Sequence, residues 1–177
     1  AGPDPFRYTR SRSKGERVLA SSTGVYNLLK LGHVLAAGVW VGGNVMILIM
    51  SVRVQRERDP ERSLAFVRDL GQIGQRIIAP ISIALIVFAV TLVIYAPQWN
   101  FSDTWIELGI LGYLATFITG IAFLGPSAGK IEKLLAGGKA ADDPEVQALI
   151  GRTMLVGRID VVVLLLVVCD MVLKPGS

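Results

Sequence analysis

The sequence predicts an all-α integral membrane protein folded as a four-helix bundle. Of its 177 residues, 52% are hydrophobic and only 18% are charged, and the charged residues leave long apolar stretches between them. A soluble domain carries about a quarter charged residues. A hydrocarbon core about 30 Å thick requires roughly 20 apolar residues in a helix. Four stretches reach that length, at about residues 26–50, 77–95, 105–124 and 153–173.

The four stretches are predicted to be helices even where β-branched residues dominate them. In lipid the backbone has no water to bond with, so a spanning segment must satisfy its hydrogen bonds internally. The run from Val161 to Val163 would favour a strand in water, and this requirement overrides it. The alternative, buried helices of a soluble protein, fits the low share of charged residues poorly.

The segments outside the spans divide the chain into a tail and one domain. Residues 1–24 are predicted to be a flexible basic tail, and residues 25–175 form the four-helix domain. The first residues, Ala1 to Phe6, look like a cloning remnant and receive no function.

Local signals predict further structure in the two long loops. Asp59-Pro60 and Asp142-Asp143-Pro144 are typical helix starts. Gly137-Gly138 indicates a turn, and Gly125-Pro126 indicates a break after the third span.

The distribution of basic residues predicts an orientation. Loop 51–75 carries five arginines and loop 125–152 carries three lysines and Arg152, whereas loop 96–104 carries no basic residue. The positive-inside rule then places loops 51–75 and 125–152 in the cytoplasm of a bacterial-type inner membrane. Five basic residues in the tail favour the opposite orientation. The net charge of +4 suits a bilayer with anionic headgroups, and no basic patch interleaved with aromatic residues indicates nucleic acid.

Ionisable and amide side chains inside the spans are the candidate functional residues, because such groups are costly in lipid. One set lies near the outer ends of the spans and a second set nearer the inner ends. An ion pair between Arg76 and Asp160, with Arg158 reaching the headgroups, would be a purely structural use of the inner set. Together the intramembrane polar candidates are Asn44, Arg76, Glu107, Arg158, Asp160 and Asp170.

His33 is the only histidine of the chain and lies about two turns inside the first span. A neutral imidazole in lipid requires a hydrogen-bond partner or a metal. The small residues around it, such as Gly32, Ala36 and Gly38, allow either close helix packing or a flat cofactor. Both uses remain open from the residues alone.

The segment that starts at His33 continues with six residues, Trp40, one residue, and the pair Gly42-Gly43. This pattern resembles the first-helix signature of the superfamily that contains the copper-resistance D membrane proteins and the bacterial membrane-bound protoporphyrinogen oxidase. The ending from Asp170 to Pro175 is similar to the Lys-Pro ending of the same group, whose branch of uncharacterised predicted integral membrane proteins is the best match.

The resemblance implies a four-helix fold and a b-type haem. His33 would be its axial, metal-ligating residue, and Trp40, Gly42 and Gly43 would line the pocket. One histidine per chain cannot supply two histidine ligands, so the second ligand would be Met171, an open site or a group from a second chain. Span three lacks the lysine of the oxidase pattern, which places oxidase activity in doubt. Copper transport lacks a ligand set, because Cys169 and Met171 do not share a helix face.

Three functions therefore remain open, and the sequence leaves open whether the protein is an enzyme. The first is a haem protein in electron transfer or redox chemistry with a redox partner. The second is an ion or small-molecule transporter or channel component, which requires a homo-oligomer because four helices enclose little space. The third is a structural or assembly protein.

Overall fold

The computed structural model describes residues 5–57 and 59–176, and it describes side chains from Thr23 onward except at positions 58 and 60. All regular structure in these residues is helical, which confirms the all-α prediction. The elements are α1 (Pro5–Glu57), α2 (Pro60–Ile73), the π-helical turn η1 (Gly74–Ile78), α3 (Ala79–Tyr95), α4 (Thr104–Thr119), the π-helical turn η2 (Gly120–Leu124), α5 (Gly125–Ala136) and α6 (Pro144–Leu173).

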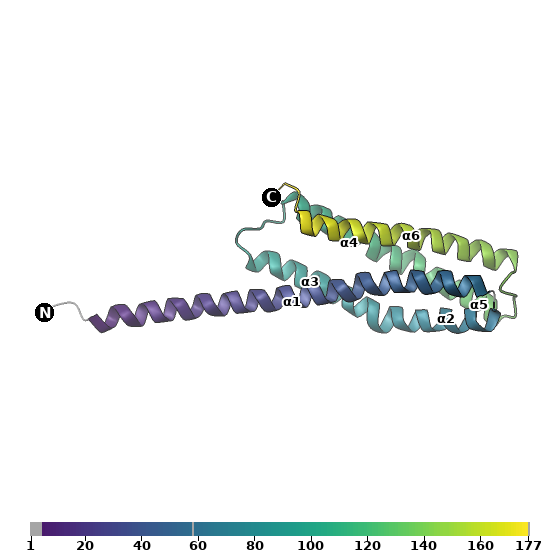
Figure 1. Cartoon of the computed structure of the whole chain (residues 1–177), viewed down its shortest axis with the longest axis horizontal. Helices are drawn as coiled ribbons and strands as arrows, with labels where there is room; N and C mark the ends of the chain where they lie inside the picture. The colour runs from purple at the N-terminus through teal and green to yellow at the C-terminus, as the bar shows by residue number, and fades with distance from the viewer. Residues whose placement is uncertain (1–4, 58, 177) are drawn as a thin grey trace.

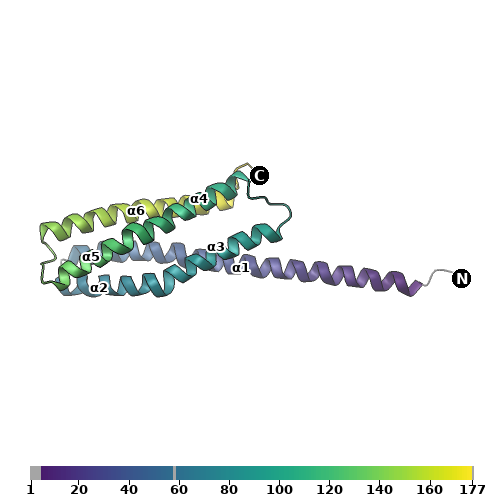
Figure 2. The same ribbon diagram turned by 180° about the vertical axis from the view of Figure 1, so that it is seen from behind.

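These elements form four long rods that pack side by side (Figures 1 and 2). One rod is α1, a second runs through α2, η1 and α3, a third through α4, η2 and α5, and α6 is the fourth. Helix α1 packs on α3 and α6, α4 packs on α6, and α2 packs on α5. One end, the charged end, contains α2, α5 and loop 137–143. The opposite tryptophan end contains loop 96–103 and the C-terminus (Figure 1).

Three of the helical segments described are long and apolar enough to cross a membrane: Thr23–Glu57, Glu61–Tyr95 and Thr104–Ala136. Three of the four predicted membrane-spanning segments are therefore confirmed as long and apolar enough to span a membrane. Helix α6 differs because every stretch of 18 residues within it contains at least three charged residues.

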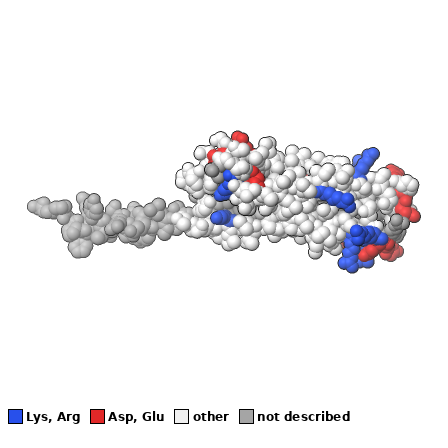
Figure 3. All heavy atoms as spheres, turned by 45° about the horizontal axis from the view of Figure 1, so that its top comes forward, with Lys and Arg blue, Asp and Glu red and all other residues white. Residues whose placement is uncertain are grey.

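The surface charge separates the two ends of the bundle from its middle. Charged side chains gather at the two ends of the bundle in Figure 3, and the surface between them is mostly uncharged. Large apolar side chains are exposed there on all four rods, among them Leu35, Val87, Leu111 and Leu166. Such a belt is unusual on a soluble monomer and suits contact with lipid.

Both predicted helix starts are confirmed. The Asp59 carboxylate accepts hydrogen bonds from the backbone N–H groups of Glu61 and Arg62, and Asp143 accepts one from Glu145 N–H at 2.8 Å. Side-chain acceptors of this kind satisfy backbone donors that a helix start leaves open. The turn at Gly137-Gly138 is also confirmed, and Gly138 has a φ of 87°, which favours glycine.

The predicted break at Gly125-Pro126 is wrong, because the third rod continues through it into α5. A five-residue π turn, η2, precedes the proline, and the Gly125 N–H bonds to the Gly120 carbonyl. The second rod repeats this arrangement with η1 before Pro80. Proline lacks an N–H and its ring collides with the carbonyl four residues earlier. A wider π turn shifts that carbonyl and lets the helix continue.

Helix α1 also begins earlier than the sequence indicated. Its backbone is helical from Pro5, through the segment predicted as a flexible tail, and it projects well beyond the tryptophan end (Figure 1). The predicted first span, residues 26–50, is thus the middle of a longer helix.

Two separate clusters of buried residues hold the rods together. The middle cluster joins one residue from each rod: Trp40, Leu85, Tyr113 and Leu164. The Trp40 and Tyr113 rings lie 5.2 Å apart, and Tyr113 stacks on Phe117. The second cluster lies at the charged end and comprises Ile131, Leu135, Ala141 and Val146, with Leu64 and Val67 of α2 packed against it.

Candidate functional site

A layer of polar side chains lies one helical turn from the middle cluster, toward the charged end. Each rod contributes one residue, three or four positions from its cluster residue. Rods α1 and α4 run toward the charged end, and α3 and α6 run away from it, so all four steps lead in the same direction. We call these residues the polar layer: Asn44, Ser82, Thr116 and Asp160.

Three residues of the polar layer donate their hydrogen bonds to their own helices. Asn44 Nδ2 donates to the Trp40 carbonyl at 2.8 Å, and Ser82 Oγ donates to the Ala79 carbonyl at 2.8 Å. Thr116 Oγ1 donates to the Tyr113 carbonyl at 3.0 Å. After donating, a hydroxyl keeps lone pairs and an amide keeps its carbonyl oxygen. The layer therefore presents mainly acceptor oxygens.

Asp160 is the charged member of this layer. Its residue is 7% exposed, and Ser82 and Thr116 are 2% and 3% exposed. Among the described residues, no side chain forms a hydrogen bond or ion pair with the Asp160 carboxylate. A buried carboxylate without a partner is costly, so a neutralising group is expected there.

The two arginines predicted near Asp160 are not its partners. Arg76 in η1 and Arg158 in α6 are both exposed, and no ion pair within the described part of the chain joins either one to Asp160. Arg158 is two positions from Asp160, and residues two apart on a helix face different directions. The structural ion pair considered from the sequence is thus not formed.

The outer polar residues lie at the tryptophan end. Glu107 is exposed, whereas both carboxylate oxygens of Asp170 are enclosed and lack a hydrogen-bond partner among the described residues. Lys174 Nζ lies 4.2 Å from the centre of the Trp99 ring, and that ring meets Trp105 edge-on. A cation over tryptophan rings at the end of a bundle fits the boundary between lipid and water.

His33 lies on α1 against α3, on the tryptophan side of the middle cluster. Its Nδ1 is 3.4 Å from the Leu85 carbonyl oxygen. When Nδ1 carries the proton and donates this bond, Nε2 keeps its lone pair, which is the tautomer of a metal-ligating histidine. Between Thr23 and Gly176, apart from positions 58 and 60, no group of three or more His, Cys, Asp or Glu residues could hold a metal ion.

Neighbouring side chains occupy the space beside several of the glycines near the candidate ligands. A Cβ at Gly32 would lie 2.8 Å from Phe88 Cζ, and one at Gly43 would lie 2.9 Å from Ile78 Cδ1. Gly109 receives the Met171 side chain and Gly112 receives Val167. Gly42 faces open space, and Trp40 is a core residue rather than a free pocket wall. These contacts show that Gly32, Gly43, Gly109 and Gly112 allow close packing of helices, whereas Gly38, like Gly42, has no neighbour within 4 Å.

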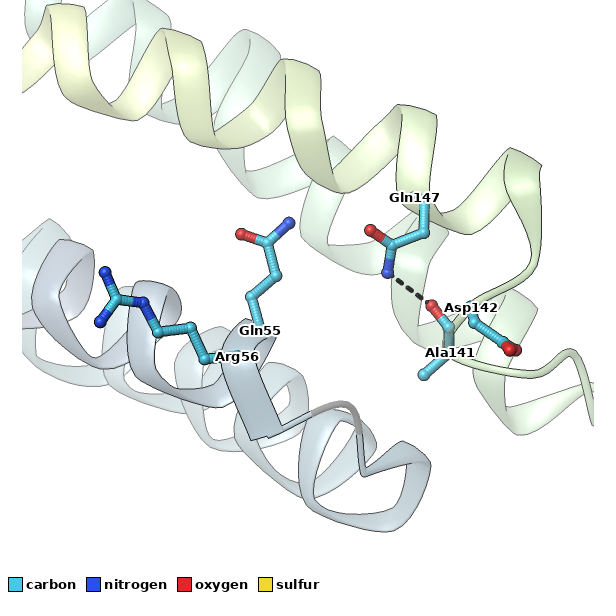
Figure 4. A pocket seen from close by; sticks show the side chains of 5 residues that line it. All are labelled: Gln55, Arg56, Ala141, Asp142 and Gln147. Carbon is cyan, nitrogen blue, oxygen red and sulfur yellow. Dashed lines mark hydrogen bonds between the residues drawn. The ribbon is translucent and has the colours of Figure 1, made fainter.

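The charged end contains a hollow of about 490 Å³ between α1, α6 and the loop before α6 (Figure 4). Gln55 and Gln147 enter it from opposite sides, and Gln147 Nε2 donates to the Ala141 carbonyl at 2.7 Å (Figure 4). Arg56 and Asp142 also line it, so their charges balance. Nearby, a hydrogen bond to Glu145 raises the pKa of Lys139.

A family model described as a predicted integral membrane protein (DUF2269) matches residues 27–175, which is most of the chain. The chain belongs to the DUF2269 family. No curated protein and no solved structure matches it. The DUF2269 match agrees with the predicted branch of uncharacterised membrane proteins, and the relation to the copper-resistance D superfamily remains a prediction.

Sequence reasoning missed Ser82 and Thr116, since only ionisable and amide groups were considered as intramembrane candidates. Both are hydroxyl residues within apolar runs, three positions from a large residue that faces the bundle centre. Counting the positions in sequence between each polar residue of a span and the large central residue of that span would have identified the layer in this DUF2269 protein.

Proposed function

We propose that this protein handles a small monovalent cation, H⁺ or Na⁺, at Asp160 as a component of membrane transport. One observation carries the proposal: a carboxylate that is 7% exposed lies at the level of three hydroxyl and amide residues of the other rods and has no basic partner among the described residues. An ionisable group inside a membrane span is by default a functional candidate.

The chemistry of the polar layer favours a cation over an anion or an apolar ligand. A proton would neutralise the carboxylate, which could then donate a hydrogen bond to one of the neighbouring oxygens. Na⁺ would be held by the same oxygens, since hard cations prefer carboxylate, hydroxyl and carbonyl ligands. The donors of Asn44, Ser82 and Thr116 are directed at their own helices, which leaves their oxygens for this purpose.

The proposal includes α6 as a fourth membrane span, beside the three apolar ones. Its charged residues lower its apolar character, but Asp160 lies inside the bundle. Its outer face carries exposed apolar residues such as Leu155, Val162 and Leu166. Its packing against α4 and α1 places it alongside two of the apolar spans.

The charged end faces the cytoplasm in this proposal, because it holds the basic loops 51–75 and 125–152. The membrane is then a bacterial-type inner membrane. Four helices leave little interior space, so a complete transport route would be shared between copies of the chain.

The test uses purified protein in liposomes that contain a pH-sensitive dye. Under an imposed membrane potential, the native chain should move protons faster than empty liposomes do, and Asp160→Asn should lose that activity. Asp142→Asn, the same change on an exposed loop, is the matched control and should behave as the native protein. An experiment with Na⁺ gradients at constant pH separates the two cations.

Equal flux by the native chain and Asp160→Asn would overturn the role of Asp160. The absence of any flux, together with unchanged folding in both variants, would favour the structural or assembly role. Infrared spectroscopy adds an independent readout: a carbonyl band of a protonated carboxylic acid should disappear in Asp160→Asn.

A second candidate function is binding of a b-type haem through His33 Nε2. The hydrogen bond between Nδ1 and the Leu85 carbonyl favours it, since it leaves Nε2 as a ligand. The Nε2 lone pair therefore fits an axial ligand. However, Phe88 occupies the space beside Gly32, next to His33, and Met171 occupies the space beside Gly109 on α4. When bound, haem would supply one-electron redox chemistry.

An absorption spectrum of the purified protein, before and after reduction, tests this candidate. A stoichiometric Soret band that is lost in His33→Ala, with helicity retained by circular dichroism, would support ligation by His33. A flat visible spectrum from cells supplied with a haem precursor would leave Asp160 as the centre of the function.

A further inference from the structure

A second concave surface at the charged end differs from the hollow of Figure 4 in its charge. It has a volume of about 500 Å³ and lies between α5 and α6. We call it the α5–α6 groove: its cations are Lys130, Lys133 and Arg152, and its apolar floor is Leu134, Ala148 and Leu149.

The three cations of the groove differ from most other basic residues at this end. Arg53 and Arg62 pair with Glu57, and Arg68 pairs with Glu132. By contrast, no carboxylate in the described part of the chain forms an ion pair with a groove cation. The one acidic residue of the groove, Glu145, is already bonded to Lys139. The groove thus carries uncompensated positive charge.

Counting along the helices from the middle cluster gives the depth of the groove cations relative to the lipid headgroups. Arg152 precedes Leu164 of the middle cluster by 12 residues, which is about 18 Å along a helix. Lys130 follows Tyr113 by 17 residues, or about 25 Å. On the other side of the cluster, the interfacial Trp105 is 8 residues from Tyr113, or about 12 Å. With the middle cluster near the bilayer centre, the hydrocarbon ends about 15 Å away and the headgroups end about 20–22 Å away. The Arg152 backbone then lies among the headgroups, and the Lys130 backbone lies just outside them, within reach of its long side chain.

The direction of the helices brings the three charges together. Cα–Cβ bonds tilt toward the N-terminus of a helix. Helix α5 runs away from the membrane, so Lys130 and Lys133 lean back toward it. Helix α6 runs into the membrane, so Arg152 leans outward to meet them.

We propose that the α5–α6 groove binds the phosphate of an anionic phospholipid headgroup. Basic pockets between helices at a membrane surface recognise anionic headgroups, and arginine can bind a phosphate through two parallel hydrogen bonds. The proposal does not depend on Asp160 or on His33.

The test is native mass spectrometry of the full chain with added phosphatidylglycerol or phosphatidylcholine of identical acyl chains. The native protein should retain phosphatidylglycerol, and the variant Lys130→Gln/Lys133→Gln/Arg152→Gln should bind it roughly 100-fold more weakly. All three positions tolerate a neutral side chain, because none of them is buried. Circular dichroism and size-exclusion chromatography check that the variant is folded.

The matched control is Arg53→Gln/Arg62→Gln/Arg68→Gln, which makes the same change in net charge at the same end. It should keep phosphatidylglycerol binding close to native. An equal loss in both variants would show that only overall charge attracts the lipid and would overturn the site. Displacement of the lipid by inorganic phosphate at equal concentration would overturn the lipid assignment in favour of a soluble anion.

Discussion

The middle of the bundle and its charged end use polar residues in opposite ways. In the middle, Asn44, Ser82 and Thr116 bond to carbonyls of their own helices. At the charged end, Arg62, Arg68 and Lys139 bond to carboxylates of other segments. A donor surrounded by apolar atoms must use the nearest acceptor, because no water replaces it. Where water is present, exposed charges pair freely and at little gain.

The comparison teaches which interactions stabilise each region. Lipid tails are as apolar as leucine, so helices in a membrane associate through close packing and hydrogen bonds rather than through the hydrophobic effect. In the placement proposed above, the charged end lies outside the hydrocarbon, and the cluster around Val146 then gains from removing apolar surface from water. Matched substitutions in the two clusters can separate these contributions.

The largest expected effect is the removal of leucine at the charged end. Leu135→Ala should lower the free energy of unfolding by about 2–5 kcal/mol, because it loses transfer from water and leaves a cavity. Leu164→Ala in the middle cluster should cost roughly half as much, since the transfer from water is absent in lipid. Reversible unfolding in nanodiscs measures both.

Leu135 is 7% exposed and Leu164 is 1% exposed. Since Leu164 is the more buried of the two, burial alone would predict the larger loss of stability for Leu164→Ala. A larger loss for Leu164→Ala would mean that the middle cluster is not surrounded by lipid. That result would also remove the basis for α6 as a membrane span.

The next effect concerns the close approach of α4 and α6. Gly112→Ala would place a methyl group against Val167, whose branched side chain has little freedom. We expect a loss of about 1–3 kcal/mol. In Gly109→Ala the new methyl group would collide with the end of the flexible Met171 side chain and touch Asp170 Oδ2 at ordinary contact distance, so this change should cost less.

The second substitution Val167→Ala tests whether the contact itself is responsible. In thermal unfolding, Gly112→Ala/Val167→Ala should recover part of the stability that Gly112→Ala loses. No recovery would place the cost in the backbone of α4 rather than at the interface with α6.

Helix content and the two helix starts in the charged loops could be predicted well, because they depend on local signals. Asp59 and Asp143 begin helices through a side-chain oxygen and a following proline, which a sequence displays directly. The continuation through Pro126 could not be read in this way, since a π turn depends on packing of the whole rod. The repeated spacing, with Gly74 six residues before Pro80 and Gly120 six before Pro126, was its only visible signal.

The candidate site was predictable only in part. Asp160 and Asn44 were identified from their chemistry, but their position in one layer depends on the register of four rods, which spacing within one helix does not determine. Arg76 was expected to pair with Asp160 because both are near the inner ends of spans. Depth alone does not fix the direction of a side chain, and Arg76 lies exposed on η1.

A smaller effect is expected from a side-chain hydrogen bond that crosses from α4 to α3 in the middle region. The Tyr113 hydroxyl donates to the Ser82 carbonyl at 2.9 Å. Tyr113→Phe should cost about 0.6 kcal/mol, the average for such bonds in a membrane protein. Denaturant unfolding in detergent measures it, and a loss above about 2 kcal/mol would indicate that the hydroxyl also orders the polar layer.

The smallest effect is expected at the ion pair between Arg68 of α2 and Glu132 of α5. The two atoms lie 3.3 Å apart, and the side chains are 54% and 40% exposed. Arg68→Gln should cost about 0.3 kcal/mol at low salt, because water screens an exposed pair. A double-mutant cycle with Glu132→Gln isolates the pair, and its coupling energy should fall further as salt is added. A coupling energy that is larger than the cost of Tyr113→Phe and does not change with salt concentration would mean that the pair is shielded from water. The contrast between the middle of the bundle and its charged end would then be wrong, because the charged end would also rely on buried polar contacts.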